Sequence, residues 1–453
     1  MLDQAPYRNL TNLTNNFYRS NPAFHFALDI ELIQYLKSKI EMAITNKKSL
    51  KKFILLGSLY ASQFIPLVFL SEAVPVFMRQ QGISLEAIGL LSLTALPVTL
   101  KFLWSPLIDR YGFTRWGHYR FWIILFQLLV VLTTAIVAFL EVKNSFTVLF
   151  ICMFSIALFC SSQDIASDAL AVGLLKPQER GLGNGIQSAG GYFGAIVGGG
   201  GMLILLNIWG WKITLLAMSF IMAISLIPLL FYKEQQTNSN PEVKPGSVNN
   251  YLKNLTNFSR RPQMWKWLLI LAIYPIAPYM ASTMFRPLLV DIGLSLTDIG
   301  LLVGGVSYTS GLLGAVLAGV LITTIGRRRS LIIFSSLEVA ALLLYLLPAL
   351  GFKNSSILYL VAIVTQLALG MLRTVIYTVM MDKSNIATAG TDYTIQTSIP
   401  YFSAIIAAIL SGVTAKTIGY TGLFTICILI AIVNVIIIFK AFVNTEEQQQ
   451  ITQ

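Results

Sequence analysis

Apolar runs of about 20 residues alternate with short polar segments along most of this chain. A helix of that length crosses the hydrocarbon core of a lipid bilayer, which is about 30 Å thick. The predicted spans are Phe53–Phe77, Leu85–Trp104, Phe121–Leu140, Phe146–Ala169, Gly185–Leu206, Trp211–Tyr232, Trp267–Val290, Thr297–Ile322, Ser330–Leu350, Ile357–Met380, Tyr393–Thr414 and Gly422–Phe442. The pattern therefore predicts an all-α membrane protein with twelve transmembrane helices, six in each half of the chain.

The two halves repeat a short sequence at corresponding places. Gly82–Leu91 and Gly293–Leu302 each follow the first span of their half and agree at most positions, with an offset of 293 − 82 = 211 residues. Gly185–Ser188 and Thr394–Thr397 form a second pair, with an offset of 394 − 185 = 209 residues. We therefore expect two pseudo-symmetric halves, an architecture in which a solute binds between the halves and rocking exposes it to each side in turn.

The polar segments set the predicted domain boundaries. These are an N-terminal tail at 1–52, a first half at 53–232, a linker at 233–265, a second half at 266–443 and a C-terminal tail at 444–453. In the N-terminal tail, apolar residues at four-residue spacing predict an amphipathic helix between Phe24 and Ile44. That helix would lie either on the inner membrane surface or on the protein's own cytoplasmic face.

The composition excludes a soluble protein, because 55% of the residues are hydrophobic and only 11% are charged. Of the 32 Lys and Arg residues, 24 fall in segments on the side of the N-terminus, five in the opposite loops and three inside spans. Since basic loops stay in the cytoplasm, we expect both termini there. This bias and attraction to anionic lipid account for the net charge of +12. The expected partners are therefore a lipid bilayer and a small solute, and no nucleic acid.

The sequence offers little chemistry for catalysis. It has two His residues, neither of them in a span, and three Cys residues, all within spans. A metal centre would need a cluster of His or Cys ligands, and an ATP-driven pump would need a Gly-Lys-Ser/Thr loop, which the sequence lacks. We therefore expect no enzyme, no cofactor and no metal site.

Few charged residues lie inside the predicted spans, where an ionisable group is costly and usually faces a cavity or an opposite charge. Three are cations, Lys101, Arg286 and Arg373, and they would attract an anionic solute to a site between the halves. With neighbouring polar and aromatic residues they give the predicted substrate-binding set: Lys101, Gln163, Arg286, Arg373, Tyr279 and Tyr377. The alternative for the cations is a set of salt bridges with Glu72 or Asp164 that lock helices together, and for the tyrosines it is ordinary helix packing.

The carboxylates inside spans are candidates for coupling to protons. Asp164 and Asp168 are one helical turn apart, so they share a face of one helix. Two carboxylates this close repel each other, which favours a proton on one of them. Asp164, Asp168 and Glu72 are therefore the predicted proton-coupling residues. The alternative is that a carboxylate pairs with Lys101 or an arginine and only holds the helix bundle together.

Prolines and glycines mark helices that bend or pack closely. Prolines interrupt the first span and its counterpart in the second half, the seventh, which would free backbone groups for a ligand. Glycines at four-residue intervals in the fifth span let helices approach closely, with a sliding seam as the alternative. These residues are Pro66, Pro75, Pro275, Pro278, Pro287, Gly190, Gly194 and Gly198.

The loop after the second span resembles the signature Gly-x-x-x-Asp-Arg-x-Gly-Arg-Arg of the major facilitator superfamily. It reads Ser-Pro-Leu-Ile-Asp-Arg-Tyr-Gly over residues 105–112, with Ser in place of the first Gly and the further basic residues displaced to 115–120. The loop after the eighth span, 319–328, keeps the spacing but has two Thr where Asp and Arg would stand. The resemblance implies that the Asp of the first loop meets a helix N-terminus and basic groups of the other half, and so latches the cytoplasmic side. It implies these gating residues: Asp109, Arg110, Arg115, Arg327 and Arg328.

Longer stretches narrow the resemblance. Lys101–Tyr111 and Ser162–Asp168 resemble the AmpG muropeptide permeases and their relatives. Within that group, four segments are most similar to the RhtX/FptX siderophore permeases: Gly112–Arg120, Ala169–Val172, Glu179–Gln187 and Gly390–Gln396. The resemblance covers about residues 53–443 and leaves the N-terminal tail outside.

This resemblance implies import of a siderophore, free or as its ferric complex, from the periplasm across the bacterial inner membrane by alternating access. The carboxylates in the spans add the expectation of proton coupling, and we expect a monomer. One alternative is a permease for a muropeptide or another amphiphilic metabolite. An alternative of a different class is a membrane sensor that binds solute and signals through the N-terminal tail without transport.

Overall fold

The structure, a computed structural model, describes residues 47–83, 91–112, 117–141, 146–234, 261 and 264–441. The predicted amphipathic helix, most of the predicted linker, the C-terminal tail and the gating candidate Arg115 lie outside these residues. Within the described ranges every regular element is a helix, as the hydropathy pattern predicts.

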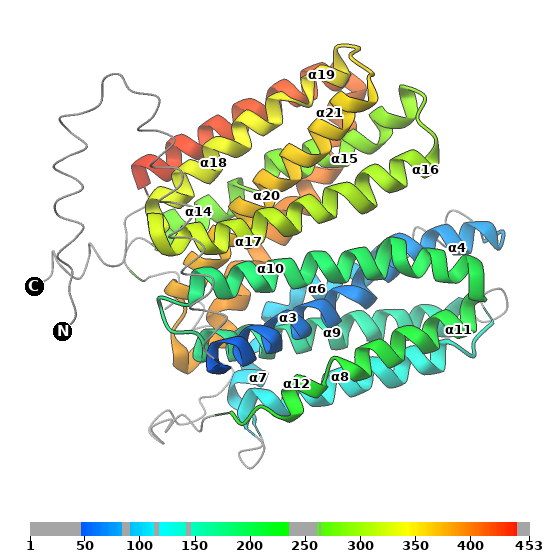
Figure 1. Ribbon diagram of the computed structural model, residues 1–453, viewed down its shortest axis with the longest axis vertical. Coiled ribbons are helices and arrows are strands. Elements are labelled where there is room, and N and C mark those ends of the chain that lie inside the picture. The colour runs from blue at the N-terminus through cyan, green and yellow to red at the C-terminus, as the bar shows by residue number, and fades with distance from the viewer. Residues whose placement is uncertain are drawn as a thin grey trace, which may run out of the picture. The chain divides into compact units, whose positions relative to one another are not determined.

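The helices of the first half include several short segments. They are α3 (Lys47–Val68), η1 (Phe69–Ala73), α4 (Val74–Gln80), η2 (Leu91–Ala95), α6 (Leu96–Leu100), η3 (Lys101–Leu103), α7 (Ser105–Arg110), α8 (His118–Val137), α9 (Phe146–Leu174), α10 (Arg180–Ile196), η5 (Val197–Gly201), α11 (Met202–Ile224) and α12 (Ile227–Leu230). We call the end of the helix bundle that carries α7 the α7 end, and the opposite end the α4 end; they lie at the left and the right of Figure 1.

The second half follows the same plan with longer elements. They are α14 (Met264–Ile273), α15 (Ile276–Asp291), α16 (Leu296–Ile299), η6 (Gly300–Ser307), α17 (Tyr308–Ile325), α18 (Arg327–Leu343), α19 (Leu346–Ala349), α20 (Ser355–Lys383), η7 (Ile386–Thr388) and α21 (Ala389–Ala441). In Figure 1 the blue-to-green helices of the first half and the yellow-green-to-red helices of the second form two groups, which meet where α10 and α17 run side by side.

The described helices account for the twelve predicted spans. Nine of them are long and apolar enough to cross a membrane, and two of these nine, 180–230 and 386–440, each contain two successive predicted spans. A shorter apolar helix at 93–103 occupies the place of the second span. Large apolar side chains on the outside of the bundle, such as Phe220 and Ile409, suit contact with lipid.

Each half ends its first span with the same helix cap. Gly82 and Gly293 have φ angles of 79° and 95°, a region that favours glycine because it carries no Cβ. In both halves the amide of the following residue donates to the carbonyl five residues before it, at 3.1 Å. This is the hydrogen bond that closes a helix C-terminus around a left-handed glycine. The repeated sequence therefore encodes the same helix end twice.

Two more pairs of positive-φ glycines extend the repeat to the backbone. Gly117 and Gly326 are one pair (326 − 117 = 209), and Gly210 and Gly419 are the other (419 − 210 = 209). Gly210 and Gly419 lie between successive spans, where the hydropathy pattern predicts short loops. There a single glycine turns the chain, with φ of 71° and 74°, and helix resumes on both sides. The predicted loops are too long, because a single glycine, which has no Cβ, is enough to turn the chain.

The predicted interruptions in the first and seventh spans are confirmed. After Pro66 the first span changes to the π-helix η1, and Pro75 lies in the first turn of α4. In the second half Pro275 is the N-cap of α15, after α14 has ended at Ile273. Two further π-helices, η5 and η6, follow in the first and second halves. Such segments are rare and often mark functional sites.

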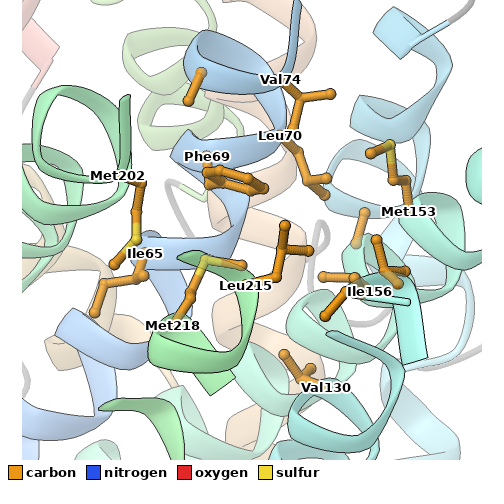
Figure 2. Close-up of a cluster of buried hydrophobic side chains, with 14 of the residues drawn as sticks. Ile65, Phe69, Leu70, Val74, Val130, Met153, Ile156, Met202, Leu215 and Met218 are labelled. Atoms are coloured by element: carbon orange, nitrogen blue, oxygen red, sulfur yellow. The ribbon is translucent and has the colours of Figure 1, made fainter. Parts of the chain in front are cut away.

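Each half also has its own apolar core. In the first half Phe69 from η1, Ile156 from α9 and Leu215 from α11 belong to one cluster of buried side chains (Figure 2). The second half has a separate cluster built on α15, α18, α20 and α21. Cys160 belongs to the first cluster and Cys427 to the second, and both are free thiols. They serve as packing residues, as expected from their places in spans.

The glycines of α10 and η5 allow close packing against two helices, α3 and α17. Gly190, Gly194 and Gly198 pack against the backbone of α3, as their four-residue spacing predicts. Closer to the α7 end, Gly185 faces α17 of the other half, where a Cβ on it would lie 2.8 Å from the carbonyl oxygen of Ala315. The fifth span therefore packs closely on its own half and forms a backbone-to-backbone seam with the other half.

The packing of η5 on α3 gives a first prediction. In Gly198→Ala the new methyl group would overlap the carbonyl of Ile65, whereas in Gly200→Ala, two residues away on the same π-helix, it would meet no atom within 4 Å. We expect Gly198→Ala to lower the free energy of unfolding by about 1–3 kcal/mol and Gly200→Ala to change it by less than about 0.5 kcal/mol. Thermal unfolding of the two purified variants in detergent tests this, and equal melting temperatures would contradict the packing.

Candidate functional site

Two adjoining cavities lie within the bundle and share four lining residues. Their volumes are about 20 and 30 Å³, room for only a water molecule or two, so both are closed around their lining side chains in this structure. The larger one is lined by both halves: Tyr60, Phe64, Lys101, Asp164, Asp168, Gln187, Ser188, Gly191, Arg373, Tyr377, Tyr393, Thr397 and Tyr401. The smaller one shares four of these residues, Arg373, Tyr377, Thr397 and Tyr401, and adds Tyr274, Tyr279, Leu369 and Pro400. We call the two together the inter-half cavity.

One wall of the inter-half cavity is a cluster of buried charges. Lys101, on η3, forms an ion pair with Asp164 of α9, and its Nζ lies 3.9 Å from Oδ2 of Asp168. The hydroxyl of Tyr60, from α3, donates to Asp168. Asp164 and Asp168 share a face of α9, as predicted, and both carboxylates turn toward one ammonium group. The cluster therefore holds two acidic groups and one base, so it carries a negative charge unless a proton is bound.

The pairing with Lys101 also fits the alternative of a helix lock, since a charge removed from water must be paired. The Lys101 side chain is only 1% exposed, and that of Asp168 4%, whereas that of Asp164 is 21% exposed. Asp164 is thus the carboxylate of the cluster with the better access to solvent. Asp168 is enclosed between Lys101 and the Tyr60 hydroxyl.

The other wall holds Arg373 among aromatic rings. Its Nε donates to the hydroxyl of Tyr377 at 3.0 Å, and its guanidinium lies 5.1 Å from the centre of the Tyr377 ring and 5.8 Å from that of Phe64. Within the described part of the chain, no carboxylate forms an ion pair with Arg373. Tyr279, the remaining aromatic candidate, lines the cavity as well. Arg373 is therefore a cation that lines the inter-half cavity and has no ion pair among the described residues.

Three predicted site residues lie elsewhere. Arg286 of α15 pairs with Glu72 of η1 at 3.3 Å, so the salt bridge named as the alternative is the contact that forms. Neither residue lines the inter-half cavity, because both lie nearer the α4 end of their helices. Gln163 is buried on α9, and it too is absent from the cavity lining. The sequence places these residues in spans but does not give the surroundings of each side chain.

The pair of Glu72 and Arg286 joins the two halves at the α4 end. The Tyr308 hydroxyl, at the start of α17, donates to Glu72 at 2.5 Å. A Cβ on Gly199 of η5 would lie 2.8 Å from the Glu72 carboxylate, so η5 packs directly on it. Glu72 thus lies on the π-helix η1 and packs against the π-helix η5. Its hydrogen-bond partner Tyr308 directly follows the third π-helix, η6. We call Glu72, Arg286 and Tyr308 the α4-end bridge.

A different contact joins the halves at the α7 end. Asp109, on α7, accepts hydrogen bonds from the amides of Gly390 and Thr391 at 3.0 and 2.7 Å and from the Thr391 hydroxyl at 2.6 Å. These amides belong to the first turn of α21, where a helix dipole favours a negative charge. The Tyr119 hydroxyl donates from the first half at 2.9 Å. This is the contact between a loop Asp and a helix N-terminus that the resemblance implies, and we call it the Asp109 latch.

Burial raises the pKa of Asp109, and the four hydrogen bonds that it accepts work against that rise. Each carboxylate oxygen accepts from one backbone amide, which can only donate, and from one hydroxyl. An ionised carboxylate therefore accepts all four bonds as they stand, whereas a protonated one fits only if a hydroxyl turns round to accept. The geometry therefore favours the anion while the latch is closed.

Basic residues add to the contact at the α7 end. Arg180 of α10 pairs with Asp382 of α20 at 2.8 Å across the halves. Arg327 reaches the same Asp382 through its Nε at 3.0 Å, and also donates to the carbonyl of Pro177 in the first half. The predicted gating candidate Arg110 instead lies 5.1 Å from the ring centre of its neighbour Tyr111. Arg328, the last described candidate, is the second residue of α18 and half-buried.

A family model described as Major Facilitator Superfamily matches residues 53–290 and 272–452. The chain belongs to the major facilitator superfamily. It is a multi-pass membrane transporter.

Relatives within the superfamily point to the AmpG group. The anhydromuropeptide permease of Escherichia coli K12 is 30% identical over 284 residues, which are 61% of this chain and 56% of that permease. A Rickettsia typhi protein named putative transporter AmpG 3 is 26% identical over 386 residues, 81% of this chain and 90% of its own. Among solved structures, the human organic anion transporter MFSD10 superposes with a TM-score of 0.66 at 14% identity, covering 86% of this chain and 98% of that one, which shows the shared fold. These relatives support the AmpG-like resemblance, and they give no support to the RhtX/FptX grouping.

The sequence analysis did not single out several residues of the inter-half cavity and of the α7 end. Arg180 and Asp382 lie at the ends of spans, where a charge is ordinary, and only the fold brings them together. Tyr60 and Tyr393 line the cavity, but an aromatic residue in a span carries no signal of its own. Gln187 was within reach, because the repeated Gly-Ile-Gln-Ser and Thr-Ile-Gln-Thr segments place a glutamine at the same point of each half.

The Asp109 latch gives a second prediction. In Asp109→Asn one oxygen becomes an amide that faces donors, so at least one backbone amide of α21 loses its acceptor. A hydrogen bond to a charged group contributes about 1.5–3 kcal/mol, so the variant should shift the α7 end toward an open form by about 10-fold or more. Spin labels on Leu107→Cys and Ile386→Cys, both exposed and on opposite halves, would report a longer distance in this variant.

The control for this experiment is Asp298→Asn, which changes an exposed aspartate of α16 that bonds only its neighbour Ser295 among the described residues. It should leave the label distance unchanged. An unchanged distance in Asp109→Asn as well would show that the latch does not hold the halves together.

Proposed function

We propose that this chain imports a muropeptide-like solute, an amphiphile that carries carboxylate and amide groups, across the bacterial inner membrane. The observation that carries the proposal is Arg373, a cation at the inter-half cavity with tyrosine rings around it and no carboxylate partner among the described residues. The guanidinium group presents donors in a planar fork that matches a carboxylate. Tyrosine rings offer apolar faces and hydroxyl groups to a sugar. The relative named anhydromuropeptide permease supports the same class of cargo.

The size of the cargo supports transport by alternating access. A disaccharide with a peptide is far larger than a cavity of about 30 Å³ can enclose, so the halves must separate to admit it. Inter-half contacts lie at both ends, the Asp109 latch at one and the α4-end bridge at the other. We infer that they open in turn. From the distribution of Lys and Arg, the α7 end faces the cytoplasm and the α4 end the periplasm.

The charges of the cavity suggest how protons couple to this movement. Lys101 and Arg373 balance Asp164 and Asp168, so the four groups together are neutral when all are ionised. A proton on one carboxylate leaves a net charge of +1, which attracts an anionic cargo to Arg373. Proton and cargo would therefore bind together and leave together. Asp164 is the candidate carrier because its side chain is the more exposed of the two carboxylates.

Siderophore import, the expectation from the short motifs, uses the same chemistry, since a carboxylate or hydroxamate would also bind at Arg373. It ranks second because the relatives carry muropeptide names. A solute sensor would bind the same ligands without moving them. Uptake therefore separates all three proposals in one assay.

That assay gives the third prediction. Cells that lack their own permeases and express this chain should accumulate a radiolabelled anhydromuropeptide in a saturable manner, and should not accumulate an iron-55-labelled siderophore. Arg373→Ala should raise KM about 10- to 100-fold, because it removes a charge-assisted hydrogen-bonded pair worth about 1.5–3 kcal/mol. Arg373→Lys should recover only part of the affinity, because a point charge lacks the planar fork.

The control is Arg329→Ala, which removes an exposed arginine of α18 and should leave KM unchanged. Saturable siderophore uptake instead would restore the second proposal. Binding of either ligand to the purified protein without any uptake would favour a sensor.

Coupling gives the fourth prediction. In proteoliposomes, a proton gradient directed with the cargo should speed uptake by the native protein. In Asp164→Asn the remaining Lys101 and Asp168 still form a neutral pair, so we expect a folded carrier whose uptake no longer responds to the gradient. Intact coupling in both Asp164→Asn and Asp168→Asn would exclude this cluster as the proton site.

A further inference from the structure

The wall of the inter-half cavity contains a buried amide with no partner. Gln187 of α10 is 1% exposed, and neither its Nε2 nor its Oε1 has a hydrogen-bond partner among the described residues. The next residue, Ser188, also lines the cavity, and its hydroxyl has no partner in the described ranges either. Leaving a buried polar group unpaired costs about 1–3 kcal/mol. Two adjacent unpaired groups beside a cavity point to a ligand that satisfies them.

The second half shows what the same sequence does when its role is structural. Gln396 occupies the position of Gln187 in the repeat (396 − 187 = 209) and is also fully buried. Its Oε1 accepts from the Trp267 indole at 2.8 Å, and its Nε2 donates to the carbonyls of Met380 and Asp392, both at 3.1 Å. Every hydrogen-bonding atom of this side chain is therefore used within the fold. The fold can satisfy a glutamine at this point, and in the first half it does not.

The residues that follow show the same contrast. Thr397, the counterpart of Ser188, donates to the carbonyl of Thr394 at 3.2 Å. Ser188 makes no such bond within the described residues. The repeat has thus kept a polar pair on both helices, paired in α21 and unpaired in α10, and the unpaired copy lies on the same cavity as Arg373.

We propose that Gln187 and Ser188 bind an acetamido group of the cargo, a neutral amide, while Arg373 binds its carboxylate. This inference rests on the proposed function and names which part of the cargo the first half recognises. An amide group of the cargo carries one hydrogen-bond acceptor and one donor. The Gln187 side chain carries the complementary groups, a donor at Nε2 and an acceptor at Oε1, and the Ser188 hydroxyl can act as either. A carboxylate would leave Oε1 of Gln187 without a donor, and an ammonium group would leave Nε2 without an acceptor. The pair is therefore suited to an uncharged amide.

The test compares two probes on the purified full chain. One is an anhydromuropeptide with its acetamido groups intact, and the other is the same molecule with each acetamido group replaced by a hydrogen atom, which can neither donate nor accept a hydrogen bond (the deoxy probe). The native protein should bind the acetamido probe about 10-fold more tightly, the difference expected for one or two neutral hydrogen bonds. In Gln187→Met, which keeps the length of the side chain, the acetamido probe should lose about 10-fold and the deoxy probe should be unaffected. Ser188→Ala, a smaller change, should reduce the preference part of the way.

Thermal unfolding separates recognition from structure. Gln187→Met should melt at or above the temperature of the native protein, since it removes unpaired buried polar atoms, whereas Gln396→Met should melt lower because it breaks a satisfied network. A preference for the acetamido probe that persists in Gln187→Met and Ser188→Ala would overturn the inference and show that water, not cargo, serves these groups. So would an equal loss of both probes together with a lower melting temperature. If the native protein binds neither probe, the proposed function itself is wrong.

Discussion

A charge inside a membrane must have a partner, and this requirement organises the protein. Lys101 can be buried only because Asp164 and Asp168 face it, and Glu72 is held by Arg286 and Tyr308. The first set lies within one half and shapes a cavity wall, while the second crosses between the halves and joins them. Arg373 differs, since its described neighbours are aromatic rings and hydroxyls, and Glu338 of α18 is a second buried group without an ion pair among the described residues. A cation without an ion pair at the inter-half cavity is the feature on which the proposed solute site depends.

The two ends are held by unlike chemistry. At the α7 end Asp109 accepts four hydrogen bonds, two of them from backbone amides, so the contact has a fixed geometry and is largely removed from water. At the α4 end the Arg286 side chain is 50% exposed, and the bridge is built on segments of π-helix. An exposed ion pair contributes less than a buried one, since water screens it. The α4-end bridge is therefore the weaker of these two contacts, which fits the direction of import proposed above.

Features that repeat along the chain were predictable from the sequence, and choices among single residues were not. Hydropathy predicted the spans, and one helical turn of spacing predicted that Asp164 and Asp168 share a helix face. Their pairing with Lys101 was only the alternative to a role in proton coupling. The Asp109 contact followed from a family motif. The sequence left open whether Arg286 faced a solute or a carboxylate, because either satisfies a buried cation. Gln187 and Gln396 have the same local sequence and opposite surroundings, so only the packed structure tells them apart. The siderophore grouping rested on short loop and helix-end motifs, which report less on the cavity than on the turns between spans.

The packing between α10 and α17 has a consequence for the turnover rate of the transporter. At Gly185 the two halves touch through the backbone of Ala315 and Gly319, whereas elsewhere along the seam the Tyr192 ring packs against Gly311 and the Ile322 side chain against Gly181. A backbone contact needs no change of rotamer when one half turns on the other, but these two side chains must slide or rotate. The activation enthalpy of such a turn would therefore depend on two side chains of the seam as well as on the contacts at the two ends, and substitutions at Tyr192 or Ile322 would alter the turnover rate without touching the cavity.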